Sequence, residues 1–254
     1  MYDATNKTLV TTADIVAGLH ALGIQEGDLL QVHSSLSALG YVQGGAEAVV
    51  DALLQAVGAS GTVMVPTFNH GTVAVFDPAT SPSVSGAISE AFRHRPGAHR
   101  SVHPTHPYAA IGPLADSLTS EHLELLTFDR RSPLGKLADL GGWVLLLGVG
   151  MDRNTAAHIG EQLANVPCFA DRELPCKIVG PDGSIQEAWS VIWRDGPCFI
   201  EWEPLENTMR ERNMIRDGRI GTAAVHLMRA KDVIEVAFEL THTMCPRCTT
   251  RPIA

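Results

Sequence analysis

The chain has 254 residues, of which 45% are hydrophobic and 19% are charged, and its formal net charge is -9. This length fits one large α/β domain or two small ones, and the composition is that of a globular protein. The acidic balance argues against nucleic acid as a partner, since phosphate binding needs a basic surface. It suits a cationic ligand, although an acidic balance also serves simply to keep a protein soluble.

Cysteine usage and the N-terminus indicate the compartment. The odd number of cysteines and their scattered spacing do not predict a disulfide framework. The segment from Met1 to Lys7 is polar and is not a signal peptide. No apolar run reaches the roughly 18 residues that would span a bilayer. We therefore expect a soluble, cytoplasmic protein with no membrane partner.

Helix and strand patterns alternate along the first two thirds of the chain. In order, they predict a helix over 12–22 capped by Thr11 or Thr12, a buried strand over 28–33, a helix over 46–57 ended by Gly58, a β-rich segment over 62–68, a loop over 69–85, and a helix over 85–92. Residues 100–107 are expected to be extended or turning, because a residue before proline is kept out of the α region. The clearest buried strand is 142–149, followed by a helix over 155–163 with Asn154 as its cap.

The last third is less regular. A strand is predicted over 187–194, turned at Asp182 and Gly183, and further elements are a strand over 223–228 and a helix over 231–240. Strands that alternate with helices predict an α/β fold in which helices cover a sheet as a three-layer sandwich. No internal repeat or linker marks off a second domain, so residues 1–254 are expected to form one.

His158 and Glu161 are the first candidates for chemistry. They stand at the start of a predicted helix just after a buried strand, and their i,i+3 spacing places both on one face. Ligands usually bind at the carboxyl ends of such strands. A carboxylate beside an imidazole sets its tautomer and makes it a general base near neutral pH. The alternative interpretation is an exposed charged pair on a solvated helix face.

Three other segments have both a functional and a purely structural interpretation. Gly148 and Gly150 join that strand to that helix, either as a ligand-approach turn or as an ordinary tight turn. Ser34 and Ser35 follow a predicted strand and either hold a ligand carbonyl or phosphate or cap a turn. Arg100 and Ser101 offer a cation and a hydroxyl to a phosphorylated cofactor, or are surface polarity.

A metal site is a further possibility near the C-terminus. Cys245 and Cys248 form a C-x-x-C with His242 close by, which is part of a zinc ligand set. A closed site needs a fourth ligand from elsewhere, with Cys168, Cys176 and Cys198 as the candidates. The catalytic hypothesis below requires no metal.

With these residues in view, the sequence resembles the aminoglycoside 3-N-acetyltransferase family. The similar segments, in order, are HSSLSALGYVQGGAEAVVDALLQAVGASGTVMVPTF (33–68), FDPATSPSVSGAISEAFRHRPGAHRSVHP (76–104), SPLGKL (132–137), LLLGVGMDRNTAAHIGE (145–161) and, more faintly, GRIGTAAV (218–225). The resemblance implies a three-layer αβα sandwich around a mixed sheet, acetyl-CoA as co-substrate and a 2-deoxystreptamine aminoglycoside as the cationic acceptor.

The resemblance also assigns residues. The family's catalytic histidine falls on His158 with Glu161 as its acidic neighbour, and its acyl-CoA contacts fall around Ser34, Ser35, Leu36 and the Gly148 turn.

The acceptor side is assigned less fully. Of the acidic residues that bind the acceptor, only Asp77 can be placed in the short segment 68–85, with Glu187, Glu201, Glu203 and Glu206 as alternatives further on. A homodimer is one of the assemblies that the sequence allows.

The mechanism expected from these assignments is direct transfer in a ternary complex. His158 takes a proton from the acceptor amine, Glu161 stabilises the imidazolium, and the amine attacks the thioester. Three alternatives remain: the same transfer to another amine in natural-product metabolism, a binder of cationic ligands without turnover, and a zinc-dependent hydrolase.

Overall fold

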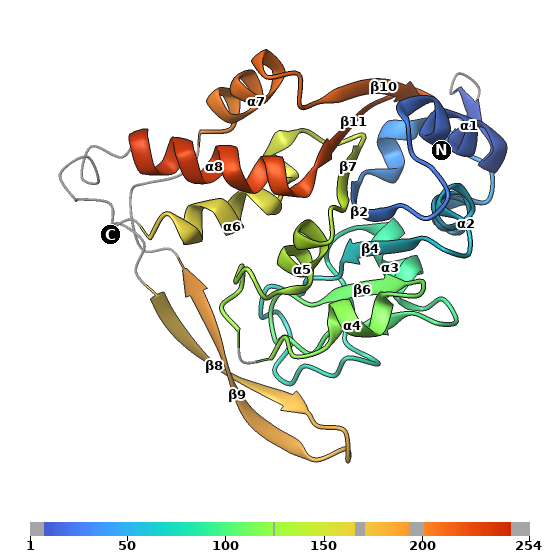
Figure 1. Cartoon of the computed structure of the whole chain (residues 1–254). Helices are drawn as coiled ribbons and strands as arrows, with labels where there is room; N and C mark the ends of the chain where they lie inside the picture. The colour runs from blue at the N-terminus through green and yellow to red at the C-terminus, as the bar shows by residue number, and fades with distance from the viewer. Residues whose placement is uncertain (1–7, 124, 166–170, 194–200, 245–254) are drawn as a thin grey trace, which may run out of the picture.

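The computed structural model describes residues 8–123, 125–165, 171–193 and 201–244. A seven-stranded mixed sheet runs through it in the order β10-β11-β7-β2-β4-β6-β5 (Figure 1). Its centre is three parallel strands, β7 (Trp143–Leu147), β2 (Leu29–Ser34) and β4 (Thr62–Pro66). Antiparallel neighbours extend the sheet on both sides: β11 (Ala223–Arg229) and β10 (Arg216–Ile220) beyond β7, and β6 (Tyr108–Ile111) and β5 (His99–Arg100) beyond β4.

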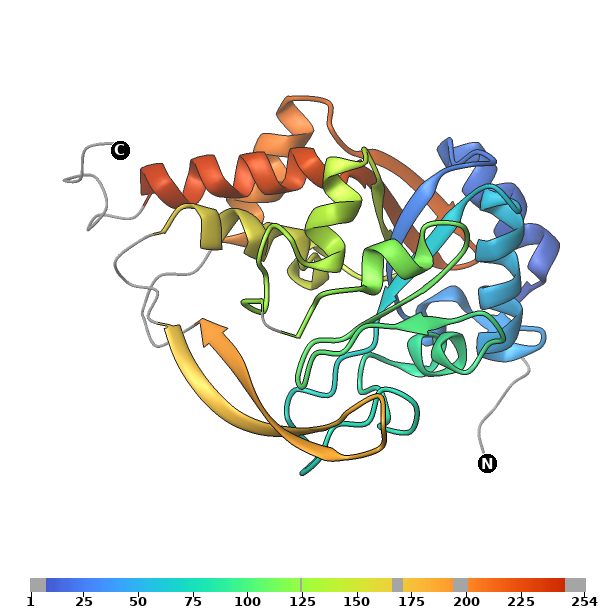
Figure 2. The same cartoon turned by 60° about the horizontal axis from the view of Figure 1, so that its bottom comes forward.

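Helices cover both faces of this sheet, so the predicted three-layer αβα arrangement is confirmed (Figures 1 and 2). One face carries α1 (Thr12–Leu22), α2 (Gly45–Val57) and α3 (Ala87–Arg93); the other carries α4 (Ala115–Thr119), α5 (Pro133–Asp139), α6 (Ala156–Leu163), α7 (Trp202–Glu211) and α8 (Ala230–Met244).

The central strands are apolar on both sides because both faces are covered. Alternate side chains of a strand point to opposite faces. Leu145 and Leu147 of β7 accordingly pack with α1 and α2, whereas Val144 and Leu146 pack with α5, α6 and α8. A strand buried on both faces reads as a continuous hydrophobic run, which is why the sequence pattern located β7 so clearly.

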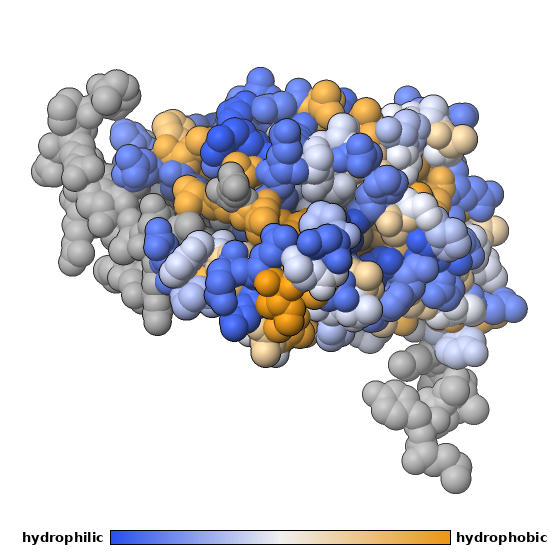
Figure 3. Space-filling model, turned by 90° about the horizontal axis from the view of Figure 1, so that it is seen from below, coloured by the Kyte–Doolittle hydropathy of each residue, from blue (hydrophilic) through white to orange (hydrophobic). Residues whose placement is uncertain are grey.

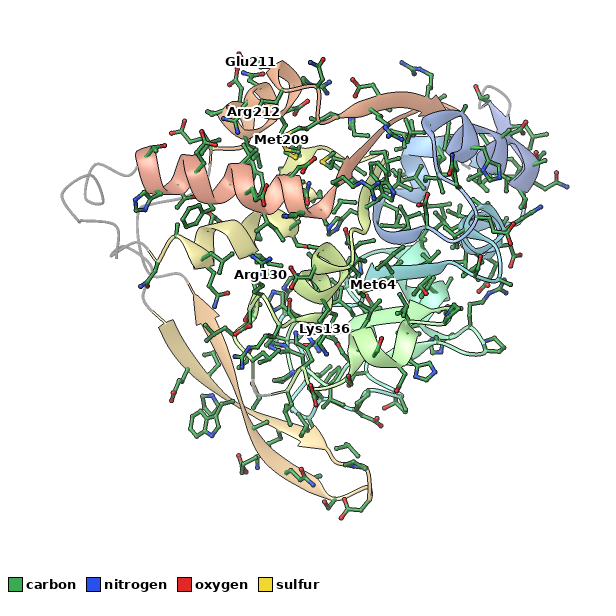
Figure 4. All side chains as sticks on the ribbon, viewed as in Figure 1. Met64, Arg130, Lys136, Met209, Glu211 and Arg212 are labelled. Carbon is green, nitrogen blue, oxygen red and sulfur yellow. The ribbon has the colours of Figure 1, made fainter. Side chains whose placement is uncertain are left out.

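Helices α7 and α8 pack against each other at the outer edge of the second helical layer. Met209 of α7 is fully buried in the cluster that includes α8, and Arg212 next to α7 donates two hydrogen bonds of 2.8 Å to Glu239 of α8 (Figure 4). No helix in the described part of the chain is both long enough and apolar enough to cross a membrane.

Two small strand pairs lie outside the main sheet. β1 (Leu9–Val10) pairs with β3 (Tyr41–Val42), and β8 (Asp171–Val179) pairs with β9 (Ile185–Trp193) as a long hairpin that extends away from the sheet (Figure 2). Phe76 anchors this hairpin, since its backbone N–H donates to the Lys177 carbonyl at 2.7 Å and its carbonyl accepts from the Val179 N–H at 2.8 Å.

The surface of the molecule seen from below carries hydrophobic patches among mostly hydrophilic residues (Figure 3).

Several local predictions differ from the structure. The cap position of α6 is Thr155, one residue later than Asn154, although the Asn154 side chain still accepts from the Ala156 N–H at 3.2 Å. The strands β6, β8 and β10 and the helices α4, α5 and α7 have no counterpart among the predicted elements. Strand β10 is exposed at four of its five positions and β8 contains a proline, so neither shows the apolar alternation that predicts a strand.

Candidate active site

His158 and Glu161 form the centre of the candidate site. They lie three residues apart on α6, and His158 Nδ1 is 2.5 Å from Glu161 Oε2. The Glu161 side chain is 0% exposed and that of His158 is 15% exposed, so the interpretation as a solvated surface pair is wrong. A carboxylate next to Nδ1 keeps the ring proton there and leaves Nε2 as the basic nitrogen of the neutral ring.

Aromatic rings hold the imidazole of His158 from two sides. The Phe128 ring lies 4.9 Å away, centroid to centroid, and the Trp202 ring lies 5.5 Å away in an edge arrangement. Trp202 begins α7, so two segments distant in sequence meet at this histidine. Packing on two sides restricts rotation of the ring. A fixed ring orientation is what a base needs if its nitrogen is to meet a substrate proton.

A cavity of about 600 Å³ opens in front of His158. It lies at the carboxyl ends of the parallel strands: Ser34 ends β2, Pro66 ends β4, and Val149 follows β7. Ligands bind at this edge of open α/β sheets. The remaining described lining residues come from the ends of these strands, from the loops beyond them and from α6, and include His33, Ser35, Phe68, His70, Val84, Ser85, His106, Thr127, Phe128, Asp152, Arg153 and Thr155.

A second groove, also of about 600 Å³, shares Ser34 and Ser35 with this cavity. Leu36 lines the groove, together with small residues such as Gly45, Gly86 and Ala87. The serines predicted to bind the cofactor therefore lie where the two spaces meet. The structure brings Ser34, Ser35 and Leu36 together, and it places the first two in the same cavity as His158.

The two glycines of the predicted turn, Gly148 and Gly150, have close neighbours at the position that a Cβ would occupy. Gly148 has φ +73°, and a Cβ there would lie 2.6 Å from the Cβ of Ala38. A side chain is therefore excluded by close packing against the turn at Ala38. Gly150 would bring a Cβ to 2.9 Å from an Asp152 carboxylate oxygen. Val149, between the two glycines, is the residue of this turn that lines the cavity.

Arg100 and Ser101 lie away from the described cavity walls. The Arg100 guanidinium donates to the carbonyls of Thr67 at 2.7 Å and Ser81 at 2.5 Å and lies over the Phe76 ring. It thus holds the loop 67–81 in place. Ser101 is buried, where its hydroxyl accepts from the Tyr108 N–H at 2.9 Å. Neither residue is placed to contact a phosphorylated cofactor in that cavity.

The predicted acidic residues are distributed around the site. Asp77 stabilises a turn, because its carboxylate accepts from the Thr80 hydroxyl and the Ala79 N–H, and these bonds lower the pKa of Asp77. Glu201 and Glu203 are exposed and flank Trp202, the residue that contacts His158.

The other two of the four alternatives named for the acceptor, Glu187 and Glu206, both have a basic partner. Glu187 lies 3.4 Å from the Lys177 amine, and Glu206 lies 2.7 Å from the Arg210 guanidinium. Glu201 and Glu203 adjoin Trp202 in sequence, and neither is among the described residues that line the cavity.

Sequence reasoning missed several lining residues. Asp152 and Arg153 line the cavity with side chains 54% and 70% exposed, and their charged groups are 3.3 Å apart. The sequence signal that could have found them was their position just after the most clearly predicted strand, 142–149. His70 and His106 also line the cavity, and burial lowers the pKa of both rings. Nothing in the sequence pattern around these two histidines distinguishes them from surface residues.

The zinc hypothesis is left untested by the described residues. Cys168, Cys198, Cys245 and Cys248 lie outside them. Cys176 is a free, half-buried thiol, and burial raises its pKa. Within the described ranges, no group of three or more histidine, cysteine or carboxylate side chains is arranged to hold a metal ion.

A buried carboxylate–histidine pair that faces a cavity at the carboxyl edge of an α/β sheet is an arrangement that proton-transferring enzymes use. The family model for aminoglycoside 3-N-acetyltransferase matches residues 31–242. The chain therefore belongs to the aminoglycoside 3-N-acetyltransferase family, as its resemblance predicted, and it is an acyltransferase.

Relatives support this along most of the chain. Aminoglycoside N(3)-acetyltransferase IV from Salmonella sp is 33% identical over 89% of this chain and 85% of its own length. Aminoglycoside N(3)-acetyltransferase VIII from Streptomyces fradiae is 34% identical over 91% of each.

Solved structures agree. The apoenzyme of aminoglycoside acetyltransferase AAC(3)-IVa has a TM-score of 0.83 at 30% identity, covering 96% of this chain and 97% of that one. AAC-IIIb in a binary complex with CoASH has a TM-score of 0.87 at 26% identity, covering 96% and 100%. A mutant of AAC(3)-IVa in complex with a gentamicin has a TM-score of 0.83 at 31% identity, covering 94% and 92%.

Proposed function

We propose that this protein transfers the acetyl group of acetyl-CoA to the 3-amino group of a 2-deoxystreptamine aminoglycoside, with His158 as the general base. The observation that carries the proposal is the 2.5 Å contact of His158 Nδ1 with the fully buried Glu161 at the edge of a cavity. The names of the relatives support the 3-amino position, and the structures of relatives with CoASH and with gentamicin support the two substrate classes.

The proposed reaction removes two protons from the acceptor. The acceptor ammonium first loses a proton to give the free amine. The amine nitrogen then attacks the thioester carbonyl carbon, and as the C–N bond forms His158 Nε2 takes the second proton. The C–S bond breaks and the thiolate leaves, which is easy because a thiol has a pKa of about 8.5. His158 returns its proton to that thiolate, so the net products are amide, CoASH and one proton.

Glu161 supports this step through charge and orientation. A buried carboxylate at Nδ1 stabilises the imidazolium that His158 becomes and keeps Nε2 pointed toward the cavity. A binding protein that merely sequesters cations would gain nothing from this pair, because a proton acceptor held against a buried carboxylate serves proton transfer.

The groove beside Ser34 and Ser35 fits the pantetheine arm of a coenzyme. Small residues line the groove together with Leu36, Tyr41 and Val42, and it joins the His158 cavity at the two serines, so a slender chain laid along it would deliver its thioester to the base. Ser34, Ser35 and Leu36 would contact that chain. Arg153, exposed on the cavity wall, is the cation placed to meet a phosphate near the entrance.

Acidic groups near the base suit a polycationic acceptor. Asp152 lines the cavity, and Glu201 and Glu203 lie on either side of Trp202. The formal net charge of -9 would further raise the local concentration of a cationic antibiotic.

Acetyl-CoA turnover tests the proposal, read as release of free thiol with a thiol reagent against a panel of aminoglycosides. Turnover on 2-deoxystreptamine compounds, with mass spectrometry and NMR placing the acetyl group on the 3-amine, is the expected result. Release of thiol with other amines, and with none of the aminoglycosides, would instead favour an acceptor amine from natural-product metabolism. Binding of both ligands in calorimetry with no transfer would instead favour a non-catalytic binder.

A further inference from the structure

His33 is a cavity residue that the proposed reaction so far leaves without a role. It lies near the carboxyl end of β2, directly before Ser34, and its side chain forms part of the wall that also holds His158. The residue is only 6% exposed. It reaches α6 through Thr155, which lies one helical turn before His158 and so on the same face.

The contacts of its Nε2 atom set the tautomer of the ring. The backbone N–H of Thr155 lies 3.3 Å from His33 Nε2, and a backbone N–H can only donate. Nε2 must therefore carry a lone pair, which the Gln31 side-chain nitrogen at 2.9 Å and the Thr155 hydroxyl at 3.1 Å also approach. A neutral imidazole that accepts at Nε2 carries its proton on Nδ1.

No described residue accepts that proton. Across the described residues, His33 Nδ1 has no hydrogen-bond partner, and it is not among the enclosed polar atoms that lack one. Since the ring lines the cavity, Nδ1–H is available to a ligand there. Burial above all, together with the proximity of His158 and Arg153, lowers the pKa of His33 to about 3, so the ring stays neutral under working conditions.

From this geometry we infer that His33 donates a hydrogen bond from Nδ1–H to the carbonyl oxygen of the bound acyl thioester. The inference rests on the proposed acetyl transfer. When the amine attacks, the carbonyl π electrons move to that oxygen, and the His33 donor stabilises the oxyanion until the C–S bond breaks. The Nδ1 proton stays on nitrogen throughout.

A neutral donor suits this position better than a cation. His158 must gain a positive charge during the attack, and a second charged imidazole in the same cavity would oppose that. A neutral N–H fixed by the protein stabilises negative charge on oxygen without this cost. Removing one such donor typically lowers kcat by roughly 10²- to 10³-fold.

Two substitutions separate this role from a structural one. In His33→Gln the amide overlays the Nε2 side of the ring, so the contact with Thr155 is kept and the donor at Nδ1 is lost. In His33→Asn the amide overlays Nδ1, so the donor is kept and the contact with Thr155 is lost. We expect kcat to fall about 100-fold in His33→Gln, with KM for acetyl-CoA and the melting temperature near wild type.

The Asn variant is expected to keep kcat within about tenfold of wild type, the limit for a donor that is retained but less well held. His94→Gln, at an exposed histidine that lines neither the cavity nor the groove, is the matched control. A His33→Gln variant with kcat within about threefold of wild type would overturn the inference, given the size expected for a lost donor. So would equal losses in both variants accompanied by lower melting temperatures, because that pattern marks a packing role.

The tautomer is measured independently by NMR of the wild-type protein labelled with ¹⁵N-histidine. A neutral ring protonated at Nδ1 is expected for His33 at pH 7, and a ring protonated at Nε2 overturns the inference whatever the kinetics. A wild-type protein that transfers no acetyl group would overturn the proposed function, and the role of His33 in that reaction with it. An Nε2–H tautomer in an active enzyme would overturn the inference alone.

Discussion

Histidines in two regions of this molecule have opposite surroundings. His158 has a buried carboxylate at Nδ1 and an open cavity before it. His103 and His122 are fully buried with their rings 4.5 Å apart, and among the described residues their Nε2 atoms are enclosed without hydrogen-bond partners. Their Nδ1 atoms contact backbone N–H groups or a hydroxyl in place of a carboxylate.

The difference shows that the partner at Nδ1 decides what a buried imidazole can do. A carboxylate compensates the positive charge that a base acquires, so His158 can accept a proton. Burial opposes protonation, and a donor at Nδ1 adds to this; burial lowers the pKa of His103 to about 4 and that of His122 well below its usual range. His33 combines both features, being buried and neutral like His103 yet open to the cavity like His158.

The largest expected effect is the loss of the base itself. His158→Ala removes the proton acceptor, and we expect kcat to fall about 1,000-fold, within the range of general-base contributions. Acetyl-CoA binding by calorimetry should stay within a few-fold of wild type, since the groove at Ser34 is untouched. His94→Ala is the control. Turnover retained in His158→Ala would remove His158 from the mechanism.

Removal of the compensating charge should have a smaller effect. Glu161→Gln keeps the shape of the side chain but takes away the negative charge at Nδ1, making His158 resemble the neutral histidines. We expect kcat to fall about 10- to 100-fold with little change in KM, as is usual for residues that orient a functional histidine. Steady-state kinetics on purified variants measure this. An unchanged kcat would show that orientation by packing against Phe128 and Trp202 is sufficient.

The sequence predicts the parts of this site that lie on regular elements. The run from Trp143 to Leu147 is apolar throughout, because helices cover both of its faces, and the i,i+3 spacing of His158 and Glu161 is readable once a helix is assigned after it. The burial of Glu161 is not readable, since it depends on packing around α6 by distant segments. The local pattern marked His158 and Glu161 as candidates, and the family resemblance favoured the catalytic interpretation over an exposed charged pair.

Residues whose roles depend on long-range contacts could not be assigned. Arg100 looked like a ligand-binding cation, but its carbonyl partners lie between 19 and 33 residues away in sequence. His33 and Thr155 meet across 122 residues, and no pattern around either predicts the other. The hairpin β8–β9 was half predicted, because β9 is a regular strand whereas β8 contains Pro175.

The buried histidines should make the fold sensitive to acid. Because the pKa values of His103 and His122 are lowered in the folded state, the unfolded chain binds protons first as the pH falls below about 6.5. Stability is therefore fully present above that pH and decreases below it, by up to about 1.4 kcal/mol per pH unit for each such histidine. Urea unfolding at pH 7, 6 and 5 measures the slope.

A substitution at one of these rings provides the control. His122→Gln removes one titrating group, so its stability should depend less steeply on pH, by up to about 1.4 kcal/mol per unit, whatever its stability at pH 7. Equal slopes in wild type and His122→Gln would mean that His122 takes up no extra proton on unfolding. The contrast between His122 and His158 would then be wrong.

The smallest effect is expected at Ser101, which the sequence suggested as a cofactor contact and the structure places beside His122. The Ser101 hydroxyl accepts from the Tyr108 N–H at 2.9 Å and also forms a hydrogen bond of 2.9 Å with His122 Nδ1. Ser101→Ala leaves both groups buried and unpaired, which should cost about 1 to 3 kcal/mol of unfolding free energy with KM for acetyl-CoA unchanged. Ser120→Ala, on the surface, should change neither. A raised KM for acetyl-CoA at normal stability would instead make Ser101 a cofactor contact, because a hydroxyl that only holds the buried histidine acts through the fold.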